Sequence, residues 1–140
     1  MDHRTELEIR ALVAAFEQHT LLYIEWTHSA HLTVAAVYVD KFGEKALAHI
    51  RAGIQSLNAH FGVEQTPTGG YHETLTIVWT RLIRHHLDGL PSRMAWEERI
   101  GSVVDGFQDK GVSLRHYTRE RIMSTDARYG WVEPDLAPLP

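Results

Sequence analysis

The 140-residue sequence contains no cysteine, which excludes disulfide bonds, thiolate metal sites and cysteine nucleophiles. It also lacks a basic surplus, since 14 Lys and Arg against 18 Asp and Glu give a net charge of −4. Duplex-binding modules are normally basic, so we expect no nucleic-acid partner. No apolar run approaches the roughly 20 residues that cross a bilayer, and the charged residues 1–10 hold no apolar signal core. These absences predict a cytoplasmic protein without a membrane anchor.

Histidine is in excess, at 10 of 140 residues. The hydrophobic fraction of 44% and the charged fraction of 23% are typical of soluble globular proteins. The length suits one domain, so we expect a single helical domain over residues 1–140. Within it, the proline-rich residues 132–140 are expected to form an extended tail over the surface.

Apolar residues recur with a period near 3.6 in every long segment, which predicts an all-α fold. Thr5 and Glu8 have capping-box spacing, Thr27 is a suitable N-cap, and Gly62 takes the usual position after a helix end. Short turns between the segments favour an antiparallel helical bundle of four to six helices. The helices are expected over about 6–19, 28–41 and 44–60, from 71 or 72 to about 89, from a Ser92 cap to about 106, and from a Thr118 cap to about 128.

Several large apolar residues are assigned to the interior from these helical stripes. Val39, Leu47, Ile54 and Trp79 are expected in the core. Trp26, Tyr71 and Trp79 either fill space there or line a pocket.

Three histidines are expected to meet at one end of the bundle. The tight turn at 41–43 makes helices 28–41 and 44–60 antiparallel, and the short loop 62–70 returns the next helix to the same end. His28 and His31 share a helical face, and His72 is in phase with the core side of its helix. Inward imidazoles are costly to bury without partners, and one metal ion would satisfy all three.

Three protein ligands with an open fourth position are typical of a catalytic metal site. We therefore predict a divalent ion (zinc, nickel, iron or copper) held by His28, His31 and His72. Glu25 or Glu73 would be its fourth ligand or the general base. Two helix N-termini meet there and favour neutral imidazoles and a small anionic ligand, which Asn58, Tyr71 and Arg51 would surround.

Three motifs carry a resemblance to other proteins: Glu25-Trp-Thr-His-Ser-Ala-His-Leu32, Ile54-x-x-x-Asn58 and Gly70-Tyr-His-Glu-Thr-Leu-Thr76. Together with Ser124–Arg128 and Glu133-Pro-Asp135, they resemble a family of small uncharacterised bacterial all-helical proteins. The resemblance implies that these segments form one site, and it implies no particular activity. A looser likeness, in architecture only, is to the DinB-like helical bundles that bind metal through three histidines.

Two functions remain open at this point. The first is a metal-dependent enzyme acting on a small organic anion. The second is a non-enzymatic helical module that binds a ligand or oligomerises, for example as a homodimer, with the histidines as capping or core residues.

Overall fold

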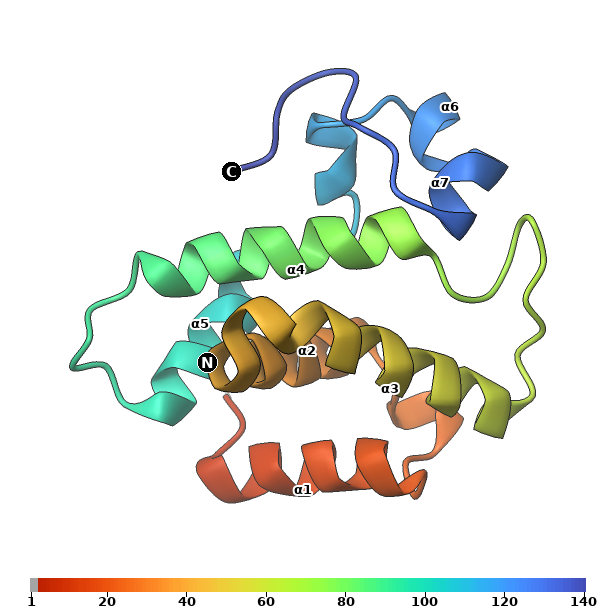
Figure 1. Ribbon diagram of the computed structural model, residues 1–140. Coiled ribbons are helices and arrows are strands. Elements are labelled where there is room, and N and C mark those ends of the chain that lie inside the picture. Colours follow the sequence, from red (N-terminus) through yellow and green to blue (C-terminus); the bar gives the residue numbers. More distant parts are fainter. Residues whose placement is uncertain (1–2) are drawn as a thin grey trace.

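The computed structural model describes residues 3–140, and over that range the chain is all-helical, as predicted (Figure 1). Within these residues, no helix is long and apolar enough to cross a membrane. Five helices of 11 to 16 residues form the main body: α1 (Glu6–Gln18), α2 (His28–Phe42), α3 (Ala46–Phe61), α4 (Glu73–Asp88) and α5 (Trp96–Gly106). The shorter elements are the 3₁₀ turns η1 (Tyr23–Glu25), η2 (Gly43–Lys45) and η3 (Val112–Arg115) and the helices α6 (Arg119–Ile122) and α7 (Thr125–Tyr129).

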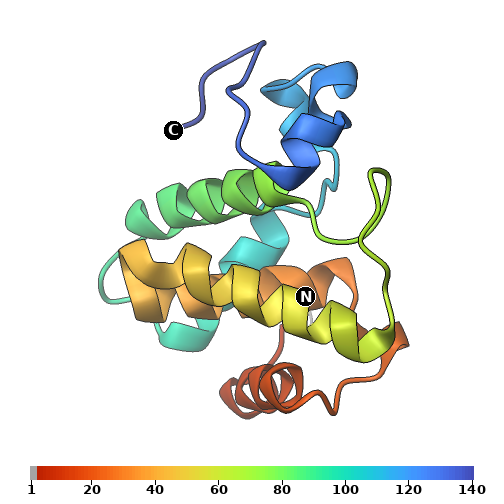
Figure 2. The same ribbon diagram turned by 45° about the vertical axis from the view of Figure 1, so that its right-hand side comes forward.

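Helix α2 is the centre of the fold, and it contacts α1, α3, α4 and α5. Such a helix must be apolar on most of its circumference, and eight of its 15 residues are buried. Helix α1 lies on one outer side of the bundle and α4 on another (Figures 1 and 2). The region after α5, with α6 and α7, lies on the outer face of α4.

The helix ends follow local chemistry where a side chain supplies the cap. Thr5 and Glu8 form the predicted capping box, and Thr27 accepts a hydrogen bond from the Ala30 N–H at 3.1 Å. Gly62 ends α3 with a φ of 73°, a left-handed conformation that glycine adopts without steric cost. These three predicted caps are confirmed.

The predicted start of α5 is wrong. Ser92 does not cap the helix, which begins at Trp96 after Ala95. The N–H of Met94 donates to the Pro91 carbonyl at 3.2 Å, so Ser92 lies inside a turn that closes before the helix begins.

The apolar interior has two parts that share α4. The larger cluster joins α1, α2, α3, α4 and α5 around side chains such as Phe16 and Leu57. The smaller cluster packs Val78 and Leu82 of α4 against the region after α5. Of the residues expected in the core, Val39 is buried, whereas Leu47, Ile54 and Trp79 are only partly buried.

Side-chain hydrogen bonds attach residues 131–140 to this second cluster. The Tyr117 hydroxyl donates to the Val132 carbonyl at 2.7 Å, and the Thr118 hydroxyl donates to the Asp135 carboxylate at 2.7 Å. On α4, the buried Thr74 hydroxyl donates to the Gly130 carbonyl at 2.6 Å and accepts from the Val132 N–H at 3.2 Å. The C-terminal region is therefore fastened to the first turn of α4.

Candidate ligand pocket

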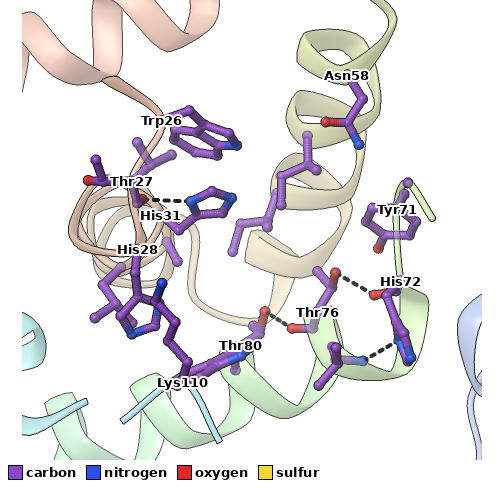
Figure 3. Close-up of a pocket in the computed structure, with 18 of the residues that line it drawn as sticks. Trp26, Thr27, His28, His31, Asn58, Tyr71, His72, Thr76, Thr80 and Lys110 are labelled. Carbon is purple, nitrogen blue, oxygen red and sulfur yellow. Dashed lines mark hydrogen bonds between the residues drawn. The ribbon is translucent and has the colours of Figure 1, made fainter. Parts of the chain in front are cut away.

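A cavity of about 630 Å³ lies between α2, α3 and α4 (Figure 3), within the size range of small-molecule sites. The loop between α3 and α4 and the segment after α5 complete its wall. The lining is mainly apolar and aromatic, and Ile54 and Trp79 are only partly buried because they face this cavity. Its polar lining residues include Thr27, His28, His31, Asn58, His72, Thr76, Thr80 and Lys110.

The imidazole of His31 points into the cavity (Figure 3). Its Nδ1–H donates to the Thr27 carbonyl at 2.7 Å, and a carbonyl can only accept, so neutral His31 carries its lone pair on Nε2. The Trp26 ring packs against it with centroids 3.8 Å apart. Burial is the main cause that lowers the pKa of His31, and the neighbouring His28 and Lys110 add to this. The site therefore holds an oriented, neutral imidazole.

Lys110 reaches the same pocket through a contact of His28. The His28 Nε2–H donates to the Phe107 carbonyl at 2.7 Å, which holds the segment after α5 against the start of α2. Among the described residues that line the pocket, Lys110 is the only Lys or Arg and none is Asp or Glu. Among residues 3–140, each ion pair that forms uses a cationic side chain other than Lys110. The charge of Lys110 is therefore available to a ligand.

His72 is not part of the helix stripe on which the metal prediction was based. It is the N-cap of α4, with φ −126° and ψ 107°, so its side chain does not follow the phase of the helix. Its Nδ1 accepts from the Leu75 N–H at 3.0 Å, and its Nε2–H donates to the Ile122 carbonyl at 2.7 Å. One ring nitrogen thus caps α4, and the other attaches α6 to the start of that helix.

The three histidines expected to converge on one ion therefore meet separate partners. Figure 3 places His28 and His72 on opposite sides of the pocket, with the His31 ring on the side of His28. Within residues 3–140, no group of three or more His, Asp or Glu side chains is arranged to hold a metal ion. Metal binding stays a prediction, which elemental analysis of untagged protein grown in metal-supplemented medium tests.

Glu73, one of the two carboxylates predicted as fourth ligand or general base, pairs with Arg51 instead of lining the pocket. The Arg51 guanidinium donates to both carboxylate oxygens, at 2.8 and 2.6 Å, and the Tyr71 hydroxyl donates to the carboxylate at 2.6 Å. The bonds from Arg51 lower the pKa of Glu73, whereas burial and the bond to Glu73 raise the pKa of Tyr71 to about 12. This cluster fastens α3 to the start of α4 behind the Tyr71 ring, which lines the pocket.

The other predicted carboxylate is also occupied by a structural contact. Glu25 is exposed, and it accepts a hydrogen bond from the Leu22 N–H at 2.8 Å within η1. Asn58 does lie in the pocket wall, near the end of α3. Of the predicted site residues, five line the pocket: His28, His31, Asn58, Tyr71 and His72. The other three, Glu25, Arg51 and Glu73, make contacts outside the lining.

The loop that closes the pocket is held by two side chains. Gln65 accepts from the Tyr71 N–H at 2.9 Å and donates to the Tyr71 carbonyl at 3.1 Å. The buried Arg128 donates to the carbonyls of Pro67 and Gly70, at 3.2 and 3.0 Å. Arg128 of α7 therefore holds a part of the pocket wall that lies far from it in the sequence.

Sequence reasoning missed Lys110, Thr76 and Thr80 as pocket residues. Lys110 follows α5 in a stretch without periodicity, and only the contact of Phe107 with α2 brings it to the site. Thr76 ends the predicted motif and Thr80 lies one helical turn after it, so their spacing from His72 was the signal that could have found them.

Comparisons of the chain with protein-family models, curated proteins and solved structures find no match. The functional argument therefore rests on the pocket itself.

Proposed function

We propose that the protein binds a small organic anion with an apolar body in the pocket between α2, α3 and α4. The observation that carries the proposal is the position of Lys110 in a mainly apolar lining that contains no acidic residue. Lys110 is exposed where it lines the pocket, and it attracts a carboxylate or a phosphate because no carboxylate of the lining neutralises its charge.

The rest of the lining supports an apolar ligand body. Trp26, Tyr71 and Trp79 offer aromatic surface, and Ile54 and Leu75 offer aliphatic surface. Pockets of this kind take most of their binding free energy from apolar contact and their orientation from a few polar groups. The N-terminus of α2, where the N-cap Thr27 and His28 line the pocket, adds partial positive charge from the helix dipole.

An enzymatic role for this site is a proposal of the same kind. Neutral His31 has the orientation that a general base needs, because its Nδ1–H is fixed and Nε2 is accessible from the cavity. The alternative is a binding module in which His31 only recognises the ligand. A divalent metal ion is a further prediction for either role.

A matched ligand panel tests the anion proposal. Thermal shift and calorimetry would compare butanoate, hexanoate, 3-phenylpropanoate and indole-3-acetate with the corresponding primary amides. We expect at least one acid to bind and its amide to bind at least about 10-fold more weakly, because the amide gains no ion pair with Lys110.

Lys110→Gln should remove this preference for the acid, whereas Lys45→Gln should retain it because Lys45 is exposed and does not line the pocket. Equal binding of acids and amides would contradict the proposal, and so would a panel in which no acid binds.

A further inference from the structure

The pocket presents hydrogen-bond acceptors to a ligand. Their own N–H or O–H groups already donate to backbone carbonyls. His31 donates Nδ1–H to Thr27 and presents the Nε2 lone pair to the cavity. The Thr76 hydroxyl donates to the His72 carbonyl at 2.8 Å, and the Thr80 hydroxyl donates to the Thr76 carbonyl at 2.7 Å. Each threonine oxygen keeps lone pairs, so the three groups can accept from a ligand (Figure 3).

A carboxylate alone does not match this set, because it carries no hydrogen to donate. An acceptor that a ligand buries without a donor loses its bonds to water and weakens binding. Sites built around a hydrogen bond to a ligand hydroxyl therefore discriminate strongly against analogues that lack it. The lining of this pocket favours a ligand that brings a donor together with its negative charge.

We infer that the natural ligand is a hydroxy acid with an apolar tail, whose hydroxyl donates to His31 Nε2 while its carboxylate pairs with Lys110. This inference rests on the proposed function, since it assumes an anion beside Lys110. It adds the position of the hydroxyl.

The two polar groups of the ligand must be close together. Lys110 and His31 line the same cavity. His28, which precedes His31 by one turn on α2, bonds to the Phe107 carbonyl and so positions the segment that carries Lys110. Figure 3 shows Lys110 beside His28, on the side of the pocket from which His31 projects. A hydroxyl one or two carbons from the carboxylate suits this neighbourhood, and the tail then extends toward the apolar surface of Ile54 and Leu75.

Calorimetry with three matched ligands tests the hydroxyl. The probes are 3-phenyllactate, its deoxy parent 3-phenylpropanoate, and 2-methoxy-3-phenylpropanoate, which has the oxygen but no hydrogen to donate. A second series would use 3-hydroxyhexanoate, hexanoate and 3-methoxyhexanoate. We expect a hydroxy acid to bind at least about 10-fold more tightly than both of its partners.

Two variants of His31 connect this preference to the imidazole. His31→Phe should reduce the preference to about 1, and His31→Gln should retain part of the preference through the amide oxygen. In the wild-type protein, the ¹⁵N resonance of His31 Nε2 should shift on adding the hydroxy acid and less on adding the methoxy acid.

The outcomes separate this inference from the anion proposal. If the deoxy, hydroxy and methoxy acids bind equally and all depend on Lys110, the hydroxyl inference is overturned and the anion proposal stands. If none of these acids binds, both are overturned. A hydroxyl preference that survives in His31→Phe would overturn the role of His31.

Discussion

Gly53 of α3 lies directly against the ring of Phe16 in α1: a Cβ placed on Gly53 would come within 2.6 Å of two ring carbons. Phe16 is itself fully buried and stacks on Trp26, with ring centroids 5.1 Å apart. Phe16 therefore cannot move aside without disturbing the residue that packs on His31.

Gly53→Ala should consequently destabilise the fold by roughly 1–3 kcal/mol, the usual cost of overpacking, despite the higher helix propensity of alanine. Gly101→Ala is the matched control, because Gly101 is also inside a helix, but the ring that its Cβ would meet at 3.0 Å belongs to the partly exposed His3. Urea denaturation should show no loss for the control, or a gain of up to about 1 kcal/mol. Equal stability of the two variants would contradict the close packing.

Leu57 and Ile54, one helical turn apart on α3, should differ sharply in their contribution to stability. Leu57 has an exposed fraction of 0%, so Leu57→Ala should cost about 2–5 kcal/mol through lost burial and a new cavity. Ile54 lines an existing pocket, so Ile54→Ala should cost less and should instead enlarge that pocket. Chemical denaturation of both variants measures this difference, and similar losses would place Ile54 in the closed core.

The cap formed by His72 should make stability depend on pH. Its Nδ1 accepts the Leu75 N–H only while the ring is neutral, and burial lowers the pKa of His72 from its ordinary value of 6.5. The unfolded chain then binds the proton more readily, so this stabilisation is complete above pH 6.5 and is lost as the pH falls through the lowered value.

His72→Asn keeps a capping acceptor that does not titrate. Its free energy of unfolding should therefore fall less steeply between about pH 7.5 and about pH 5 than that of the wild-type protein. Comparing the two curves removes the contributions of other histidines, and parallel curves would show that the cap does not titrate in this range.

Arg128→Met should loosen the loop that closes the pocket. The carbonyls of Pro67 and Gly70 would lose their buried donor, at a cost of roughly 1–3 kcal/mol. Hydrogen exchange at the amides of Thr66, Gly69 and Tyr71 should accelerate, because the loop hydrogen bonds that protect them depend on its shape.

Arg121→Met is the matched control for the loop experiment. The Arg121 guanidinium donates to the carbonyl of Glu133, in the C-terminal segment, at 2.6 Å. This variant should leave the three loop amides unchanged, and unchanged exchange in Arg128→Met as well would contradict the anchoring role.

The helices were predictable wherever their ends are encoded by neighbouring residues. Thr5 with Glu8, Thr27, and Gly62 act through contacts three residues away or through a local backbone conformation. Ser92 has the same type of side chain, but the turn from Pro91 to Met94 takes that position out of the helix. A suitable cap residue therefore predicts a helix start only when no turn precedes the helix.

The pocket was predictable in place but only partly in composition. Helix phase correctly predicts that His31 points to the interior, because His31 lies within α2. His72 precedes α4 and has an extended backbone conformation, so helix phase does not predict the direction of its side chain. Lys110 reaches the site through the Phe107–His28 hydrogen bond, which joins residues 79 positions apart. No local pattern in the sequence contains that information.

The Thr27 carbonyl accepts two bonds from one residue, the His31 backbone N–H at 2.9 Å and the His31 Nδ1–H at 2.7 Å. The partner that orients the imidazole therefore belongs to the main chain, and every amino acid at position 27 supplies it. The residues around His31 can thus be exchanged one at a time, altering which molecules fit, while the direction of its lone pair is retained. Substitutions in such a pocket can change the ligand that it binds, in nature or in the laboratory, while His31 Nε2 stays available as an acceptor.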